Sequence, residues 1–173
     1  MAIQGFRKFH IDPVWNDSFK QLEYIQEPFN DPESQAAWEQ QGYGSKFTGA
    51  MCDMRRSQPT WNNFFLGYFA EMGWHNIGTS YYRMDTGTVL PEHRDLYKRY
   101  VEIFNLQGKE QSIRRAIVFL EDWKSGHYLE IAGTSITQWS AGDAVSWSYD
   151  CPHMAANIGI EPRYTLQITG HTK

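Results

Sequence analysis

The chain has 173 residues, a formal net charge of −4 at neutral pH and a mean hydropathy of −0.59. A chain of this length fits one domain and buries roughly 70% of its unfolded surface, enough for a core without disulfides. No basic run exceeds two residues, which argues against nonspecific nucleic-acid binding. We therefore expect a single domain over 1–173 with no nucleic-acid partner.

The sequence has no apolar stretch long enough for a membrane helix, and its first residues lack the apolar core of a signal peptide. The expected location is cytoplasmic, with no membrane partner. Cys52 and Cys151 cannot make a disulfide framework, and both are expected to be small buried hydrophobes. Aromatic residues are 16% of the chain, which suits a barrel interior or a ligand pocket.

The first 79 residues are interpreted as a helical support region. Residues 17–26 and 32–41 have the spacing of two short helices, the second with Asp31 as N-cap and Pro32 at the first helical position. A third helix is predicted over 62–72, where aromatic residues and a Met form an apolar stripe. Such a stripe indicates packing against a core.

After Gly78 the hydrophobic period changes to two residues, which is typical of strands. The strand candidates, separated by Gly, Asp and Pro turns, are 80–84, 113–120, 128–131, 135–139, 144–149 and 164–169. Helices followed by several short strands predict an α+β, mainly β, domain, with helices on one outer face of an antiparallel sandwich or barrel. Residues 80–170 are the expected β core.

Three residues have the pattern of a metal site. His93 and Asp95 stand two positions apart, which points both side chains to the same side of an extended backbone. His153, from a later segment, would complete two histidines and one carboxylate, the set that leaves coordination positions open in non-haem Fe(II) oxygenases. These three are therefore the candidate metal ligands and catalytic residues.

Two other interpretations of this pattern were considered. His93-Arg94-Asp95 also begins the protein-kinase catalytic loop, but a kinase needs Asn at position 100, where this chain has Tyr100, and further motifs that are missing here. A surface turn in which Asp95 only caps the next segment remains open. The other histidines have no partner at ligand spacing and are expected to be surface or turn residues: His10, His75, His127 and His171.

Arg163 is a candidate anchor for an acid. In the strand predicted over 164–169 the even positions are apolar. The odd positions, which continue the face that begins at Arg163, are polar: Arg163, Thr165, Gln167 and Thr169. If the polar face meets solvent, nothing follows. If it lines a barrel, Arg163 is a buried charge that needs a partner, and a bidentate carboxylate matches its planar fork.

The segment 81–170, about half of the chain, resembles the Fe(II)/2-oxoglutarate-dependent oxygenases, most of all the aspartyl/asparaginyl β-hydroxylase-like group. The similar motifs are an extended segment that enters a metal His (82–84 and 89–93), a Gly-turn strand (141–145), and a His followed by a nearby Asn (153–157). Arg163 and Thr165 are similar to the Arg-x-Ser anchor of the family. Asp95 is a departure, because many members of that group lack the metal carboxylate.

The resemblance implies a double-stranded β-helix, a cupin-like jelly roll with the N-terminal helices packed on one sheet. It also implies Fe(II) at the three candidate ligands and the cosubstrate 2-oxoglutarate on Arg163 and Thr165. Asn157 is either a further residue that orients the cosubstrate or a turn residue. The implied reaction uses O₂, forms succinate and CO₂, and hydroxylates an amino acid, free or in a peptide, or a small metabolite.

Substrate contacts are proposed for Arg114, Arg115 and Trp147, although a strand-end charge in water is the simpler interpretation of the two arginines. The alternative function is a cupin-like barrel that binds a metal without 2-oxoglutarate, as another enzyme or as a binding module. Arg163 with Thr165 separates the two functions, because only the oxygenase needs a diacid anchor at that place.

Overall fold

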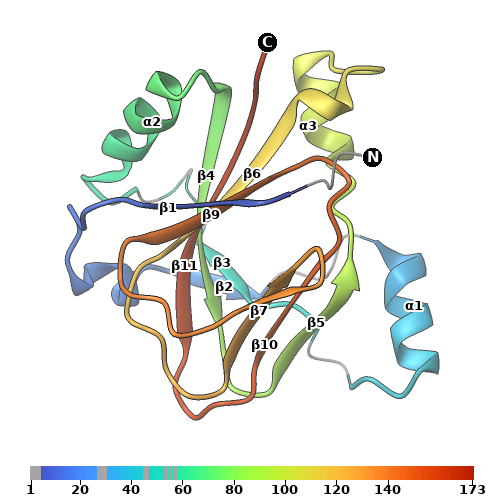
Figure 1. Ribbon diagram of the computed structural model, residues 1–173. Helices are drawn as coiled ribbons and strands as arrows, with labels where there is room; N and C mark the ends of the chain where they lie inside the picture. The colour runs from blue at the N-terminus through green and yellow to red at the C-terminus, as the bar shows by residue number, and fades with distance from the viewer. Residues whose placement is uncertain (1–4, 27–30, 45–46, 53, 55, 57) are drawn as a thin grey trace.

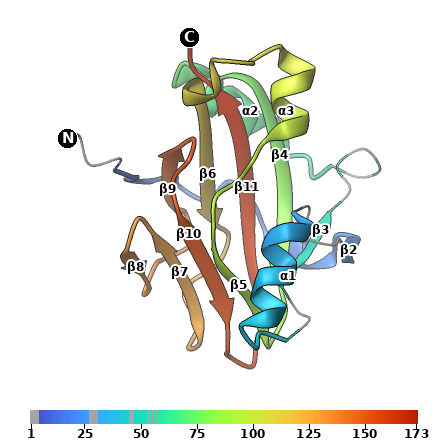
Figure 2. The same ribbon diagram turned by 90° about the vertical axis from the view of Figure 1, so that its right-hand side faces the viewer.

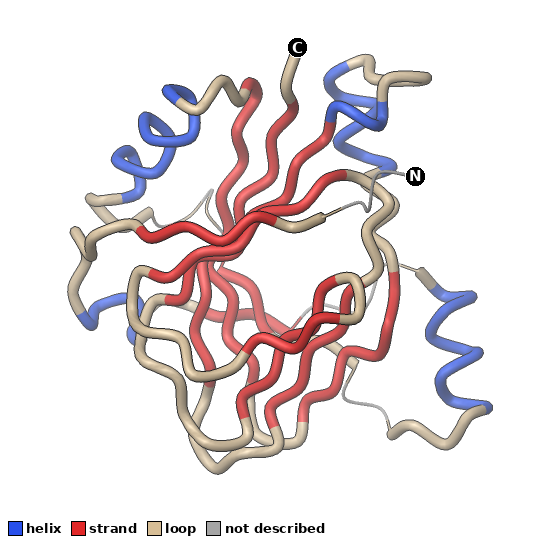
Figure 3. The backbone as a smooth tube through the Cα atoms, viewed as in Figure 1, coloured by secondary structure: helices blue, strands red, loops and turns tan. Residues whose placement is uncertain are grey.

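The computed structural model describes residues 5–173 except 27–30, 45–46, 53, 55 and 57. One set of strands is β1 (Arg7–His10), β2 (Tyr24–Gln26), β3 (Ala50–Cys52), β4 (His75–Met84), β6 (Ile113–Phe119), β9 (Asp143–Ser148) and β11 (Arg163–His171). A second set is β5 (Thr88–His93), β7 (His127–Ile131), β8 (Thr134–Ile136) and β10 (His153–Asn157). The two sets form separate sheets (Figure 3).

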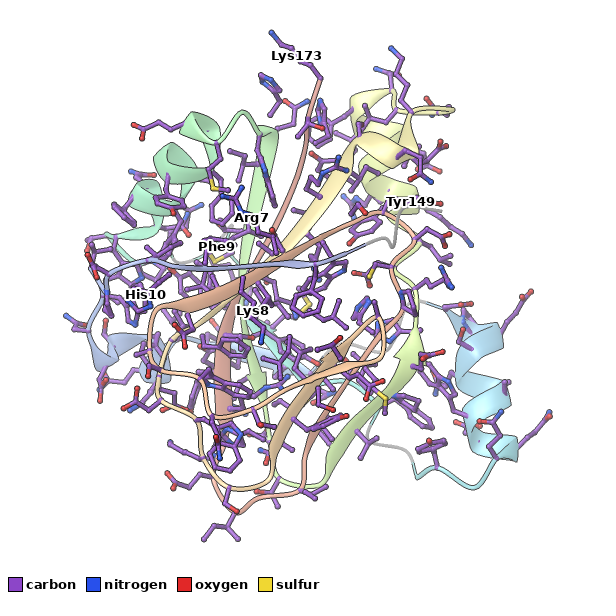
Figure 4. The ribbon with its side chains drawn as sticks, in the orientation of Figure 1. Arg7, Lys8, Phe9, His10, Tyr149 and Lys173 are labelled. Atoms are coloured by element: carbon purple, nitrogen blue, oxygen red, sulfur yellow. The ribbon has the colours of Figure 1, made fainter. Side chains whose placement is uncertain are left out.

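The large sheet has the strand order β1-β9-β6-β11-β4-β3-β2 and the small sheet the order β5-β10-β7-β8. All recorded strand pairs are antiparallel. The sheets face each other (Figures 1 and 2), and side chains fill the space between them (Figure 4). This is the jelly roll that the sequence predicts, a double-stranded β-helix.

Alternate residues of the large sheet pack on opposite sides, as the pleat of a strand requires. On β11, Leu166 and Ile168 belong to an outer apolar cluster that includes Phe65 and Phe69. The intervening residues face the small sheet, where a second cluster fills the interior. The polar face of β11 therefore lines the barrel, and the side chain of Arg163 is only 3% exposed.

Helices lie outside the two sheets. They are α1 (Pro32–Gln40), α2 (Asn62–Glu71), α3 (Lys98–Phe104) and two short 3₁₀ helices, η1 (Asp17–Gln21) and η2 (Glu110–Ser112). α2 buries Phe65 and Phe69 in the outer cluster on the large sheet. α1 lies beside β5 (Figure 2), and α3 packs through Val101 near the start of β6. No helix of the described residues is long and apolar enough to cross a membrane.

Two element predictions are wrong. The helix predicted over 17–26 is only η1, followed by β2, because Tyr24 and its neighbours pair with β3 instead of continuing the helix. The strand predicted over 135–139 ends at Ile136, since Gln138 has a φ of 57°, a left-handed conformation that a strand cannot contain. Both differences come from backbone geometry that local spacing does not encode.

Residues 1–79 also contribute strands to the large sheet. β1 pairs with β9, with Arg7 opposite Ser146, and β3 pairs with β4. Figure 4 labels the residues of β1, which is an edge strand of the large sheet although its partner β9 lies far away in the sequence. The two cysteines, Cys52 and Cys151, are buried and are not joined by a disulfide, as predicted.

Candidate metal centre

His93, Asp95 and His153 converge at one place between the sheets, and one ligand atom from each lies within 4.8 Å of the others. The Nε2 atom of His93 is 3.7 Å from Oδ1 of Asp95. The Nε2 atom of His153 is 3.7 Å from Oδ2 of the same carboxylate. A shared carboxylate facing two imidazole nitrogens is a donor set that can hold a transition metal.

A bulge in β5 turns His93 toward this group. His93 pairs with His153, and Leu90 pairs with Ala155, so β5 has two residues, Pro91 and Glu92, where β10 has one. Side chains alternate along a regular strand, so Leu90 and His93 would otherwise face opposite sides. The extra residue puts both on the cavity side. β5 is an edge strand, which explains why proline is tolerated there.

Both imidazoles are oriented by the same type of hydrogen bond. The Nδ1 atom of His93 lies 2.9 Å from the carbonyl oxygen of Pro91, and Nδ1 of His153 lies 3.0 Å from that of Cys151. A carbonyl only accepts, so in each ring Nδ1 carries a hydrogen, and in the neutral form of the ring the lone pair is then on Nε2. Nδ1 bonded to a carbonyl, with Nε2 turned toward the site, is the usual orientation of a metal-binding histidine.

The electrostatic surroundings favour the metal-binding protonation states. Burial lowers the pKa of His153 to about 4, although Asp95 acts in the opposite direction, so this imidazole is neutral at pH 7. Burial alone would raise the pKa of Asp95, but Arg115, His93 and His153 hold it well below its usual range. Asp95 is therefore a carboxylate, and its Oδ2 atom also accepts a 2.9 Å hydrogen bond from the Tyr97 hydroxyl.

The three residues open onto a cavity of about 170 Å³. Polar residues line it near the metal group and at Arg163, and apolar side chains lie between them. The lining residues include Met51, Tyr82, Met84, Leu90, Arg115, Ile117, Leu129, Trp147, Ala155, Arg163 and Gln167. The cavity is therefore lined by both apolar and polar side chains, with charged groups at Asp95, Arg115 and Arg163.

Arg163 is more buried than Asp95 and Arg115, the other charged residues that line this cavity. It begins β11 opposite Met84 of β4, and its Nη1 donates a 2.7 Å hydrogen bond to the carbonyl of Tyr128 in the small sheet. Its Nε atom is buried without a hydrogen-bond partner, and no ion pair joins Arg163 to a carboxylate of the described residues. Burial lowers the pKa of Arg163 to about 10, which still leaves it charged at neutral pH.

Thr165 follows on the same face of β11. It is 1% exposed, and its hydroxyl oxygen has no hydrogen-bond partner among the residues that the structure describes. Buried polar groups in proteins are nearly always paired, so unpaired groups on adjacent positions of one face suggest a missing partner. Of the two possibilities left open by the sequence, the polar face of β11 therefore lines the barrel and does not meet solvent.

Asn157 lies at the end of β10 and braces a turn. Its amide nitrogen donates to the carbonyls of Met84 and Glu161, each at 2.8 Å, and its oxygen accepts from the backbone N–H of Gly159. Both amide hydrogens are thus used by the backbone. Of the two roles considered from the sequence, the turn role fits these contacts.

The two neighbouring arginines of β6 face opposite sides. Arg115 lines the cavity, and its Nε lies 3.7 Å from Oδ2 of Asp95. Arg114 instead donates to the carbonyls of Gln111 and Ile113 at the end of the strand. The structure brings Arg115 to the metal group and leaves Arg114 outside it. Trp147 also lies in the site, with its ring 5.1 Å from that of His153.

Two residues of the site went unnoticed in the sequence. Trp38 of α1 lies edge-on to His93, with ring centroids 6.1 Å apart, and Tyr97 binds Asp95. Trp38 had no signal, because its neighbour in space is far away in sequence. Tyr97 had a weak one, since it stands two positions after a proposed ligand.

The prediction that His127 is a surface or turn residue is wrong. It is 2% exposed on β7, its Nε2 donates to the carbonyl of Glu161, and its ring stacks with Trp139. The strand was predicted over 128–131, but β7 begins one residue earlier, at His127. His127 therefore occupies an inward position of this strand. His10 and His75 are exposed, as expected.

Comparison with known proteins supports the fold. No family model and no curated protein matches the chain. Among solved structures it is similar to a prolyl-4-hydroxylase from Pseudomonas putida, with a TM-score of 0.54, 14% identity, and coverage of 91% of this chain and 96% of that chain.

Two further structures are similar over part of the chain. One is a cupin protein from Bacteroides fragilis, with a TM-score of 0.40, 15% identity, and coverage of 56% of this chain and 67% of that one. The other is a predicted oxalate decarboxylase from Thermotoga maritima, with a TM-score of 0.42, 10% identity, and coverage of 70% and 79%. These scores are too low to add to the assignment, and the hydroxylase likeness concerns the fold alone.

Proposed function

We propose that the protein is an Fe(II)- and 2-oxoglutarate-dependent oxygenase that hydroxylates an amino acid, free or in a peptide, or a small metabolite. The observation that carries the proposal is Arg163, a buried cation that has no acidic partner among the described residues and lies in the same cavity as the histidines and Asp95. A ligand with a metal-binding group at one end and a carboxylate at the other matches both features. 2-Oxoglutarate is such a diacid.

The cost of burying Arg163 argues for an anionic ligand. An unpaired guanidinium in an apolar cavity is destabilising, and a single carbonyl contact does not neutralise it. A carboxylate would bind its planar fork through two parallel hydrogen bonds, and the Thr165 hydroxyl would donate a third. Both groups that lack a partner would then be satisfied by one ligand.

The donor set fits Fe(II). His93 and His153 would offer Nε2 lone pairs and Asp95 a carboxylate oxygen, which is the facial arrangement that leaves open positions for a cosubstrate. When bound, iron and 2-oxoglutarate would supply the oxidative chemistry, with O₂ consumed and succinate and CO₂ formed. The protein's own contribution is to hold the His153 imidazole neutral, keep Asp95 ionised and exclude water.

The size of the cavity bears on the substrate. At about 170 Å³ it is smaller than the roughly 300–1,000 Å³ of typical ligand pockets. The cosubstrate would occupy most of it, so the substrate would approach from outside. The fold shared with a prolyl-4-hydroxylase supports an amino-acid substrate, and a small metabolite that approaches from outside is equally compatible with this cavity.

The alternative is a metal-binding cupin-like barrel that makes no use of 2-oxoglutarate. Calorimetric titration of the Mn(II)-loaded protein with 2-oxoglutarate separates the two functions, with 2-oxobutanoate as a control that lacks the second carboxylate. The oxygenase proposal predicts that the diacid binds far more tightly than the monoacid. Mn(II) binding without any preference for the diacid would favour the alternative.

A further inference from the structure

Arg115 is the centre of a hydrogen-bonded cluster beside the metal group. Its Nη1 donates to Oγ1 of Thr169 and its Nη2 to Oε1 of Gln167, both at 2.6 Å. Its Nε lies 3.7 Å from Oδ2 of Asp95. Each nitrogen of the guanidinium thus faces a different side-chain oxygen, and Arg115 joins two residues of β11 to the metal-binding carboxylate.

The contacts of Asp95 are unequal on its two oxygens. Oδ2 accepts from the Tyr97 hydroxyl and lies 3.7 Å from both Nε of Arg115 and Nε2 of His153, whereas Oδ1 lies 3.7 Å from Nε2 of His93. Donors held on one oxygen fix the plane of the carboxylate and leave the other oxygen for a metal. Arg115 and Tyr97 therefore act together on the orientation of Asp95.

Arg115 also determines which way the Gln167 amide points. A guanidinium can only donate, so the Gln167 atom that it bonds must be the carbonyl oxygen. The amide nitrogen is then the other end of a side chain that lines the cavity. No hydrogen bond from this nitrogen to another described residue is recorded. Gln167 thus presents N–H donors to a ligand in the cavity.

We propose that Arg115 is a positioning residue that orients Asp95 for metal binding and turns the Gln167 amide so that its N–H groups bind an oxyanion of the cavity ligand. The part concerning Gln167 rests on the proposed function, in which that ligand is 2-oxoglutarate. The part concerning Asp95 requires only a metal. Arg163 would hold one carboxylate of the diacid, and Gln167 would contact oxygen atoms nearer the metal.

The orienting role is tested by metal affinity without any cosubstrate. Arg115→Gln and Arg115→Lys are compared with Arg114→Gln, a matched control on the outer side of the same strand. Titration with Mn(II) should show a loss of about 10-fold or more in both Arg115 variants and no comparable loss in the control. Thermal unfolding of the metal-free proteins shows whether each variant is folded.

The positive charge of Arg115 and its positioning of Asp95 predict opposite effects on Mn(II) affinity in these variants. A positive charge near a cation repels it, so if Arg115 acted only through its charge, Arg115→Gln would bind Mn(II) more tightly and Arg115→Lys would behave like the parent. If it positions Asp95, lysine cannot replace it, because one ammonium cannot serve three oxygens in fixed directions. Parental or tighter binding in folded Arg115→Gln would overturn the proposal.

The Gln167 role is tested with Gln167→Glu, which keeps the shape and still accepts from Arg115. This variant replaces the N–H donors by an acidic oxygen, so 2-oxoglutarate should bind the Mn(II) protein about 10-fold more weakly or worse. Unchanged 2-oxoglutarate affinity would show that Gln167 only braces Arg115. Should the parent protein itself fail to bind 2-oxoglutarate, the proposed function fails, whereas the Mn(II) comparison still decides the role of Arg115.

Discussion

His93 and His153 lie directly opposite each other on β5 and β10, with ring centroids 4.3 Å apart. Each ring donates through Nδ1 to a carbonyl two residues earlier in its own chain segment. The two ligands are therefore fixed by a strand pair and by their local backbone before any metal binds. Preorganised ligands of this kind lose little freedom on binding.

The metal group is tested by removing either imidazole. His93→Ala and His153→Ala should each lower Mn(II) affinity by at least about 100-fold, since even outer contacts of metal ligands cost about 10–100-fold. His75→Ala is the matched control, because His75 is exposed and outside the cavity. Metal titration of the three variants measures this, and equal losses in all three would show that the wrong histidines were chosen.

Arg163→Ala should weaken 2-oxoglutarate binding while sparing the metal. Losing a buried charge-assisted contact costs about 2–5 kcal/mol, which corresponds to roughly 30-fold or more in affinity. Arg163→Lys should recover only part, since an ammonium lacks two parallel donors. Titration of each Mn(II)-loaded variant gives both constants. A variant with alanine that keeps parental affinity for 2-oxoglutarate contradicts the anchor assignment.

Replacing Arg163 should weaken 2-oxoglutarate binding but stabilise the fold of the ligand-free protein. Arg163→Met removes a buried charge that has no acidic partner in the part of the chain that the structure describes, and it keeps much of the side-chain volume. We expect the free energy of unfolding to rise by about 1–3 kcal/mol. Urea unfolding of the metal-free parent and variant measures this difference. A clear loss of stability would show that the contact with Tyr128 already satisfies the guanidinium.

Asn157→Ala tests the turn brace. The substitution deletes three hydrogen bonds: those from the Asn157 amide to the carbonyls of Met84 and Glu161, and the one that its oxygen accepts from Gly159. The expected loss is about 2–4 kcal/mol of unfolding free energy, with Mn(II) affinity unchanged. Urea unfolding and metal titration provide the two values. Parental stability combined with weakened 2-oxoglutarate binding would instead favour a cosubstrate-orienting role.

His127 should make stability depend on pH. Burial lowers its pKa, with the Glu161 carbonyl acting in the opposite direction, and its Nδ1 has no acceptor for an added proton. A base with a lowered folded pKa stabilises fully above its unfolded value, near 6.5, and less as pH falls toward the folded value. His127→Gln should flatten this decline in urea unfolding between pH 5 and 7.5. An equal decline in both proteins would assign it to other groups.

Much of the fold and the site could be predicted from alternation and motif order. The period of two on β11 indicated that Arg163 and Thr165 share a face, but burial of that face could not be predicted, because it depends on the small sheet that lies opposite. The bulge at Pro91 and Glu92 could not be predicted, because it depends on pairing with β10. The same holds for β2, whose residues look helical alone but pair with β3.

The neighbours of the ligands were the least predictable part. Trp38 reaches His93 from a helix more than fifty positions earlier, and nothing in either segment indicates the other. Arg114 and Arg115 are equivalent in sequence, and only strand register decides that Arg115 faces Asp95. Contacts of this kind follow from tertiary packing and require coordinates.

The central claim is that one cavity joins an Fe(II) site to a carboxylate anchor at Arg163. The most direct measurement is the visible absorption of the anaerobic Fe(II) protein as 2-oxoglutarate is added, for the parent and for Arg163→Ala. We predict a charge-transfer band of a chelated keto acid that saturates in the parent and needs about 30-fold more ligand, or more, in the variant. Absence of the band in a parent protein with Fe(II) demonstrably bound would contradict the account.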